Sequence, residues 1–203
     1  MSKQNIRERV WQLMEEKNIA AFPRPVYHRI PNFIGAQEAA QKLREQPEFK
    51  SAKTVFCNPD APQRYIREIA LRDGKQLVMA TPKLRQGFLL IDPNSISASN
   101  ITEAATIRGA FKYGHPVDPA NVTIDLFVAG SVAVSPNGGR LGKGTGYSDK
   151  EHSILKDAKA LSPQAIVATT VHDVQVVENI SANEWDVPVD VIVTPTRVIR
   201  ITK

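Results

Sequence analysis

The sequence predicts an α/β protein, a three-layer α/β/α sandwich with a mostly parallel sheet. Short apolar runs that suit buried strands alternate with amphipathic segments of helical periodicity along much of the chain. The chain has 203 residues, of which 42% are hydrophobic, and this is enough for one sizeable core. No Gly/Ser-rich linker or charge run divides it. We therefore expect a single domain, residues 1–203, in which helices bury both faces of the sheet.

The N-terminal part of the chain predicts two helices joined by an extended stretch. Residues 4–18 repeat apolar side chains at helical spacing, and Ser2 precedes them as a candidate N-cap. Pro23 and Pro25 then break the helix and impose an extended path. Residues 32–44 form the second expected helix.

An alternation of strands and helices begins at residue 54. Residues 54–58 predict a short strand, and residues 58–62 predict the turn that follows it. Residues 63–73 predict a helix stopped by Gly74, and the next strand is expected at 76–81. The remaining expected elements are strand pieces at 124–129 and 132–134, a helix at 149–161, and strands at 165–171, 189–193 and 197–201.

Composition narrows the classes of function. The net charge of +5 favours anionic ligands in general, but the basic residues are dispersed, so a nucleic-acid surface is not expected. Cys57 is the one cysteine, which excludes an internal disulfide and a thiolate zinc site, and its apolar neighbours predict a core position. The charged N-terminus and the lack of a long apolar run predict a cytoplasmic protein with no membrane partner.

The most informative segment is residues 138–149, GGRLGKGTGYSD, which lies between an expected strand and an expected helix. Its many glycines are costly in regular elements, but they leave backbone N–H groups free to approach a ligand. Such a loop at a helix N-terminus suits phosphate, and Arg140 and Lys143 add cationic side chains. The spacing matches neither a Walker A loop nor a dinucleotide-binding fingerprint. From the residues alone, a flexible surface hairpin remains the alternative.

Residues 140–149 resemble the R-L-G-x-G-x-G-Y-Y-D signature of the 5-formyltetrahydrofolate cyclo-ligase (methenyltetrahydrofolate synthetase) family. Further resemblances to this family occur at the pair Lys3 and Arg7 and at residues 74–82, 125–134, 175–177 and 186–190. The resemblance covers nearly the whole chain. It is closest to a divergent branch, the methenyltetrahydrofolate synthase domain-containing proteins, which residues 22–25, 28–33, 58–63 and 194–199 resemble.

The resemblance implies a sugar-phosphate-isomerase-like fold and a reaction that uses MgATP. In this family the formyl oxygen of 5-formyltetrahydrofolate is phosphorylated, N10 of the folate attacks, and phosphate leaves as the methenyl bridge closes. Arg140 and Lys143 are the implied catalytic residues, because they would hold the ATP phosphates. The implied Mg²⁺ ligand is Asp149, directly or through water. The implied cofactor-binding residues are Lys3, Arg7, Gly142, Gly144, Gly146 and Tyr147.

Three positions depart from the family pattern. The family's E-x-D-T stretch is replaced by residues 60–63, DAPQ, and the second tyrosine of its signature is replaced by Ser148. The F-D pair of its turn is replaced by Val134 and Ser135. All three changes fall in or beside the expected second-substrate pocket, whereas the nucleotide elements are better kept. The pattern indicates a retained nucleotide site and an altered second substrate.

Other polar and aromatic residues carry weaker signals. The basic residues within 24–33 either form an extra anion site or are ordinary surface and structural residues. His172, beside Asp173, is a candidate catalytic histidine, although a role in a cap or turn is the simpler interpretation. Trp11 and Trp185 are interpreted as packing anchors rather than as residues that stack on a ligand.

Three functions stay open on the sequence alone. The first is an ATP-dependent cyclo-ligase acting on 5-formyltetrahydrofolate, and the second is an ATP-dependent enzyme of the same fold acting on a non-folate formyl or amide compound. The third is a non-catalytic binding module associated with nucleotide or RNA. No RNA-recognition signature is present, so direct RNA binding has little support. The enzyme interpretation is favoured, and the expected partners are ATP and a small-molecule substrate.

Overall fold

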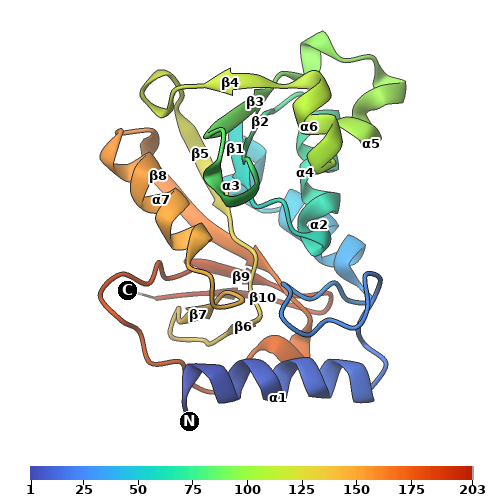
Figure 1. Ribbon diagram of the computed structural model, residues 1–203, viewed down its shortest axis with the longest axis vertical. Coiled ribbons are helices and arrows are strands. Elements are labelled where there is room, and N and C mark those ends of the chain that lie inside the picture. Colours follow the sequence, from blue (N-terminus) through green and yellow to red (C-terminus); the bar gives the residue numbers. More distant parts are fainter. Residues whose placement is uncertain (203) are drawn as a thin grey trace.

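The computed structural model describes residues 1–202 and contains an eight-stranded sheet (Figure 1). Its strands are β1 (Thr54–Cys57), β2 (Gln76–Ala80), β3 (Phe88–Ile91), β4 (His115–Val117), β5 (Ile124–Val128), β8 (Leu161–Thr170), β9 (Val191–Val193) and β10 (Val198–Arg200). Their order across the sheet is β10-β9-β8-β5-β1-β2-β3-β4. The five strands from β9 to β2 are parallel to one another. At one edge β10 pairs antiparallel with β9, and at the other β3 pairs antiparallel with β2 and β4 pairs antiparallel with β3. The predicted mostly parallel sheet is confirmed.

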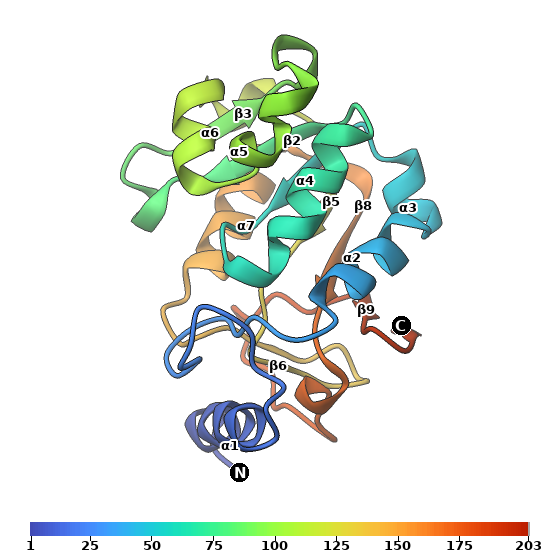
Figure 2. The same cartoon turned by 90° about the vertical axis from the view of Figure 1, so that its right-hand side faces the viewer.

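Helices cover both faces of this sheet (Figures 1 and 2). The α-helices of the described chain are α1 (Lys3–Glu16), α2 (Ala36–Arg44), α3 (Pro47–Ser51), α4 (Arg64–Arg72), α5 (Ile101–Ala104), α6 (Ile107–Tyr113) and α7 (Tyr147–Asp157). Helices α2, α4, α5 and α6 pack on one face, where their buried side chains share an apolar cluster with β1, β2 and β5. Helix α7 lies on the opposite face and places Leu155 in a second cluster. The predicted three-layer arrangement is confirmed.

Strand β1 shows how the sequence builds both layers at once. All four of its side chains are buried, and successive side chains of a strand point to opposite faces of the sheet. Val55 and Cys57 therefore join the cluster under α2 and α4, while Phe56 joins the cluster under α7. The ring of Phe56 stacks on Phe127 of β5 with ring centroids 4.3 Å apart. Cys57 occupies the predicted core position, and burial raises the pKa of its thiol to about 12.

Helix α1 packs on a small hairpin rather than on the main sheet. The hairpin consists of β6 (Ala133–Val134) and β7 (Arg140–Leu141). Ser2 caps α1 as predicted, because its hydroxyl accepts a hydrogen bond from the N–H of Asn5 at 3.1 Å. The apolar side of α1 is buried in a third cluster, shared with the hairpin and α2. Trp11, 1% exposed, is the packing anchor that the sequence predicted.

Some elements and boundaries differ from the prediction. Residues 82–120, for which no element is predicted, contain β3, β4, α5 and α6, all of them short. The helix expected at 32–44 begins only after Gly35, whose φ of +95° is left-handed. The helix expected at 149–161 ends before Leu161, which already belongs to β8. Among the described residues, no helix is both long enough and apolar enough to cross a membrane.

Candidate functional site

The candidate site lies at the edge of the sheet where the parallel strands have their carboxyl ends. Asn58 follows β1, Thr81 follows β2, and Gly130 lies just beyond β5. All three residues line one cavity together with residues 140, 142, 143 and 145–149. Open α/β sheets bind ligands at this edge because the strand ends and loops leave a crevice there.

The glycine-rich segment 138–149 contains β7, the loop that follows it and the first turn of α7. Gly144 has a φ of +99° and Gly146 a φ of +69°, a left-handed conformation that glycine adopts at little cost. Gly146 is the N-cap residue of α7, so the loop ends at a helix N-terminus, which presents backbone N–H groups and a partial positive charge. A Cβ on Gly146 would meet no atom within 4 Å. The glycine is therefore favoured there by backbone conformation and not by crowding.

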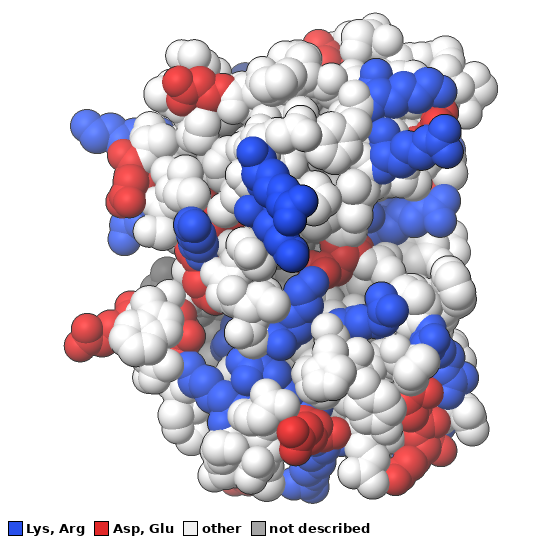
Figure 3. All heavy atoms as spheres, in the orientation of Figure 1, with Lys and Arg blue, Asp and Glu red and all other residues white. Residues whose placement is uncertain are grey.

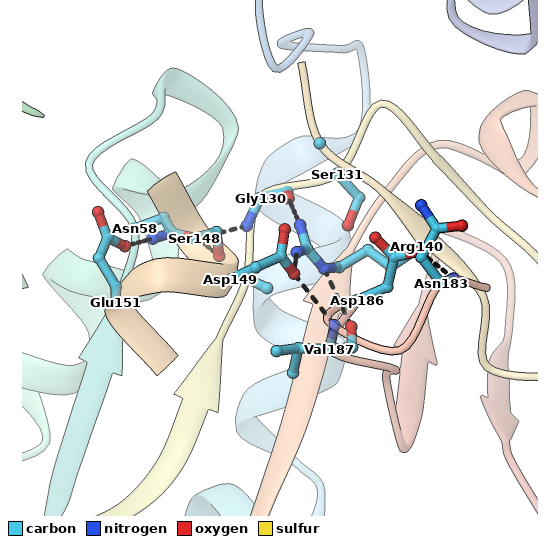
Figure 4. Close-up of polar contacts among 12 residues, drawn as sticks. Asn58, Gly130, Ser131, Arg140, Ser148, Asp149, Glu151, Asn183, Asp186 and Val187 are labelled. Carbon is cyan, nitrogen blue, oxygen red and sulfur yellow. Dashed lines mark hydrogen bonds and ion pairs between the residues drawn. The ribbon is translucent and has the colours of Figure 1, made fainter. Parts of the chain in front are cut away.

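Arg140 and Asp149 form an ion pair at the base of this loop (Figure 4). Arg140 is 4% exposed, and its Nη2 donates to Asp149 Oδ1 at 2.5 Å. Its Nη1 donates to the carbonyl of Gly130 at 3.0 Å, and Asp149 Oδ1 also accepts from the N–H of Val187 at 3.1 Å. The pair therefore joins the loop, the end of β5 and a C-terminal segment. The guanidinium expected to hold phosphate and the carboxylate expected to hold Mg²⁺ are thus in direct contact.

A first cavity of about 790 Å³ opens beside the loop. Four cationic side chains from two helices line it: Lys3 and Arg7 of α1, and Lys150 and Lys156 of α7. Arg7 is fixed to the loop, since its Nε donates to the carbonyl of Gly142 at 2.7 Å. Figure 3 shows Lys and Arg side chains gathered across the middle and lower part of this face, above α1 in the same view. The cavity therefore favours an anionic ligand.

Segment 183–188 forms another wall of the first cavity. Lys3 forms an ion pair with Asp186, which ties this segment to the start of α1. Asp186 also accepts a hydrogen bond from the N–H of Asn183 at 2.6 Å. Trp185 lines the cavity and is 72% exposed, so the packing role predicted for it is wrong. Its indole is available to a ligand because most of its surface is exposed.

A second cavity, of about 340 Å³, shares the loop as a wall. Four residues line both cavities: Arg140, Gly142, Gly146 and Asp149. Lys143 lines only the second cavity, where its Nζ lies 3.6 Å from Asp60 Oδ1. Tyr147 also belongs to the second cavity. The predicted site residues are therefore brought together, but they divide between two cavities that meet at the loop.

Asn58 organises the polar groups of the second cavity (Figure 4). Its Nδ2 donates to Glu151 Oε2 at 2.7 Å, and its Oδ1 accepts from Ser148 Oγ at 2.9 Å and from the N–H of Gly130 at 3.0 Å. Glu151 is 5% exposed. Burial raises its pKa to about 8, with the nearby charge of Asp60 adding to the rise, and burial also raises the pKa of Asp60. At neutral pH this cavity therefore holds a largely protonated carboxyl group that can donate a hydrogen bond.

Asn58 and Glu151 are site residues that were not predicted from the sequence. A signal for Glu151 was present, because Ser148, Glu151 and Leu155 lie three and four residues apart and share one face of α7. Leu155 is fully buried, so that face points into the protein. Nothing in the local pattern around Asn58 shows that it would meet a residue 93 positions away.

Two weaker candidates have structural roles. The Nδ1 of His172 accepts a hydrogen bond from the N–H of Val174 at 3.2 Å and caps a short 3₁₀ helix, so the cap interpretation is confirmed. In the segment 24–33, the side chain of Arg24 is paired with Glu15 of α1 at 2.6 Å. This ion pair holds the segment against α1. It supports the interpretation of Arg24 as a structural residue rather than as part of an extra anion site.

A magnesium ion is compatible with one carboxylate of the site. Among residues 1–202, no group of three or more His, Cys, Asp or Glu side chains forms a metal-binding cluster. Mg²⁺, however, retains several waters and commonly uses one or two carboxylates together with substrate phosphates. Asp149 lines both cavities, and hydrogen bonds from the described residues reach its Oδ1 but not its Oδ2. Its second oxygen is therefore the protein group that fits such an ion.

Comparisons with known proteins identify the family and support the fold. The model of the 5-formyltetrahydrofolate cyclo-ligase family matches residues 1–195. Methenyltetrahydrofolate synthase domain-containing proteins of Bos taurus and Homo sapiens are 45% and 42% identical over 98% of the chain. The chain spans about half the length of these relatives, 54% and 53%. The NMR structure of Aquifex aeolicus 5,10-methenyltetrahydrofolate synthetase is similar with a TM-score of 0.62 at 23% identity, covering 100% of this chain and 94% of that one.

Proposed function

The chain belongs to the 5-formyltetrahydrofolate cyclo-ligase family, and we propose that it is an ATP- and Mg²⁺-dependent ligase that forms 5,10-methenyltetrahydrofolate from 5-formyltetrahydrofolate. One observation carries this proposal: two cavities share the glycine-rich loop as a common wall. Phosphoryl transfer requires the phosphate donor and the accepting oxygen to be held in line within one site. A loop that borders both cavities suits this task, because a phosphate bound to it is within reach of a group in either one.

The nucleotide occupies the first cavity in this proposal. Lys3 and Arg7 contact its phosphates from α1, and the backbone of the loop and the N-terminus of α7 contact them from the other side. Arg140 holds Asp149 in place through Oδ1 and leaves Oδ2 as the oxygen that would hold a magnesium ion. Such an ion would supply positive charge to the phosphates. The carboxylate itself is oriented by two hydrogen bonds to its other oxygen.

The formyl compound occupies the second cavity, with its formyl oxygen directed at the loop. That oxygen forms a bond to the γ-phosphorus, and the bond from phosphorus to the departing ADP breaks. N10 then attacks the formyl carbon, phosphate leaves, and the N10 proton passes to the phosphate or to solvent. Lys143 lies in this cavity beside Asp60, and its ammonium stabilises the negative charge on the transferred phosphoryl group.

A non-folate formyl or amide substrate is the second candidate. The observation in its favour is the lining of the second cavity, which includes Asp60 and Ser148, two residues at positions that depart from the family pattern. A cavity that combines a buried carboxylic acid with Asn58 and Ser148 favours a ligand with several hydrogen-bonding groups. Both candidates use the same nucleotide site and differ in the second substrate alone.

The test is the absorbance of the methenyl product formed from 5-formyltetrahydrofolate and MgATP. Wild type is compared with Lys143→Ala and with Lys17→Ala, a lysine change at an exposed position at the end of α1. We expect conversion by wild type and Lys17→Ala and its loss in Lys143→Ala. A wild type that binds ATP without converting this substrate would favour the second candidate. A folded wild type that binds no ATP would favour a non-catalytic binding module.

A further inference from the structure

Trp185 has an unusual position for a tryptophan. It lines the first cavity with 72% of its surface exposed, whereas tryptophan is on average highly buried. Among the described residues it is the only Trp, Tyr or Phe in that lining. The side chains just before it, residues 181–184, are all exposed and mostly polar. An isolated aromatic ring at the mouth of a charged cavity fits a small planar ligand better than a protein surface.

Positive and negative side chains are unevenly distributed over the walls of the first cavity. Cations come from α1, from α7 and from Arg140 of β7, which is paired with Asp149, and the glycine loop adds a helix N-terminus. Segment 183–188 contributes the carboxylates of Glu184 and Asp186 and no cation. A polyphosphate chain is therefore drawn to the loop and to the walls formed by α1 and α7, where five of the six charged lining residues are cations. The uncharged part of a nucleotide is the part that can lie against Trp185.

The segment that carries Trp185 is fixed at both sides of the ring. The N–H of Asp186 donates to the carbonyl of Asn183 at 3.1 Å, which closes a turn with Trp185 inside it. Asp186 is in turn held by Lys3, and the N–H of Val187 donates to Asp149. The turn is thus tied to α1 and to the base of the glycine loop. A ring on a fixed turn loses little conformational freedom when it binds a ligand.

We propose that Trp185 is a base-stacking residue: its indole packs against the purine ring of the nucleotide whose phosphates bind at the glycine loop. This inference rests on the proposed nucleotide site and adds to it the group that recognises the base. Stacking on an aromatic side chain accepts any base because every base has a π-face. Trp185 therefore provides affinity for nucleotides over inorganic polyphosphates, and the phosphate-binding residues provide the remainder.

The test compares Mg²⁺-dependent binding of ATP and of inorganic triphosphate to wild type, Trp185→Ala and Trp185→Phe by titration calorimetry. We expect Trp185→Ala to weaken ATP binding about tenfold, because stacking contributes roughly 1–3 kcal/mol per base. Binding of triphosphate stays unchanged, and Trp185→Phe retains most of the ATP affinity. Because the side chain is exposed, the substitutions leave the fold intact, which circular dichroism verifies.

Fluorescence provides a second readout, since the chain has two tryptophans. Trp11 is buried, and its Nε1–H donates a hydrogen bond to the carbonyl of Arg29. It does not line the first cavity. ATP should therefore quench emission from wild type but not from Trp185→Phe. Equal ATP affinity in wild type and Trp185→Ala would overturn the stacking role and leave the proposed function standing, as would an equal loss for both ligands. A wild type that binds neither ligand would overturn both.

Discussion

Glu151 is a carboxylic acid held almost out of water, and its protonation links the second cavity to pH. Its pKa in the folded chain is raised to about 8 by burial and by Asp60, while Asn58, Arg140 and Lys143 oppose the rise. The ordinary value is 4.5, so between these two pH values the folded state holds a proton that the unfolded state has released. Unfolding then releases a proton, and the contribution of Glu151 to stability falls as pH rises from 4.5 to 8.

The substitution Glu151→Gln tests this linkage. A glutamine resembles the protonated acid in shape and can still accept the hydrogen bond from Asn58, but it has no proton to lose. We expect its melting temperature relative to wild type to rise by several degrees between pH 5 and pH 8.5, measured by circular dichroism. Asp60 is present in both proteins, so its own pH dependence largely cancels in the difference. A difference that stays constant with pH would contradict the raised pKa.

Arg140 shows what residue-level sequence reasoning reaches. Its type and its place next to glycine indicate an anion site, and the structure puts it in the walls of both cavities. Its contacts with Asp149 and the carbonyl of Gly130 depend on how three separate segments meet, which no local pattern encodes. The same holds for Lys143, whose partner Asp60 follows a different strand. Sequence therefore identified the charged groups, and the fold assigned their partners.

At the scale of elements, the glycine loop and α7 provide a test of backbone conformation. Gly146 and Gly74 both have left-handed φ values, +69° and +76°, and a Cβ on either would meet no atom within 4 Å. Alanine at either position therefore costs about 1–2 kcal/mol, which arises from the backbone alone. Gly146→Ala should also weaken ATP binding several-fold, because the strain falls at the N-cap of α7.

Gly74→Ala is the matched control for this prediction. It follows α4 and lines neither of the two cavities at the loop, so it should lose a similar amount of stability in urea unfolding and bind ATP as wild type does. If both variants bind ATP equally well, the left-handed N-cap of α7 has no part in the nucleotide site. Unequal losses of stability would show that something other than φ determines the cost.

The elements that sequence predicted are those whose burial leaves a periodic trace. Strand β1 reads as an apolar run because both of its faces are covered, and α1 reads as amphipathic because one side faces the third cluster. Helix α5 has four residues and α6 seven, which is too short for a helical period to be recognised. Strand β4 (His115–Val117) contains Pro116. It lies at an edge of the sheet, where a proline is tolerated.

At the scale of the whole molecule, α1 and the sheet are joined through shared elements. Ala36 and Ala39 of α2 belong to the cluster of α1, whereas Ala40 and Leu43 of the same helix belong to the cluster on the sheet. The hairpin makes a similar link, since Ala133 packs with α1 and Val134 packs with the cluster under α7. Because neighbouring residues on rigid elements serve different clusters, one cluster cannot open without disturbing another.

This connectivity predicts that the chain unfolds as one unit. In Trp185→Phe the only tryptophan is Trp11, in the cluster of α1, so its fluorescence reports on that region alone. Far-UV circular dichroism reports on all helices and strands together. We expect the two signals to give the same midpoint and the same steepness in urea, which is the behaviour of a single cooperative transition. An earlier transition of Trp11 fluorescence would mean that α1 and the cationic wall it supplies can detach while the sheet stays folded. Lys3 and Arg7 would then leave the first cavity with α1, and nucleotide binding would be lost at urea concentrations that leave the sheet intact.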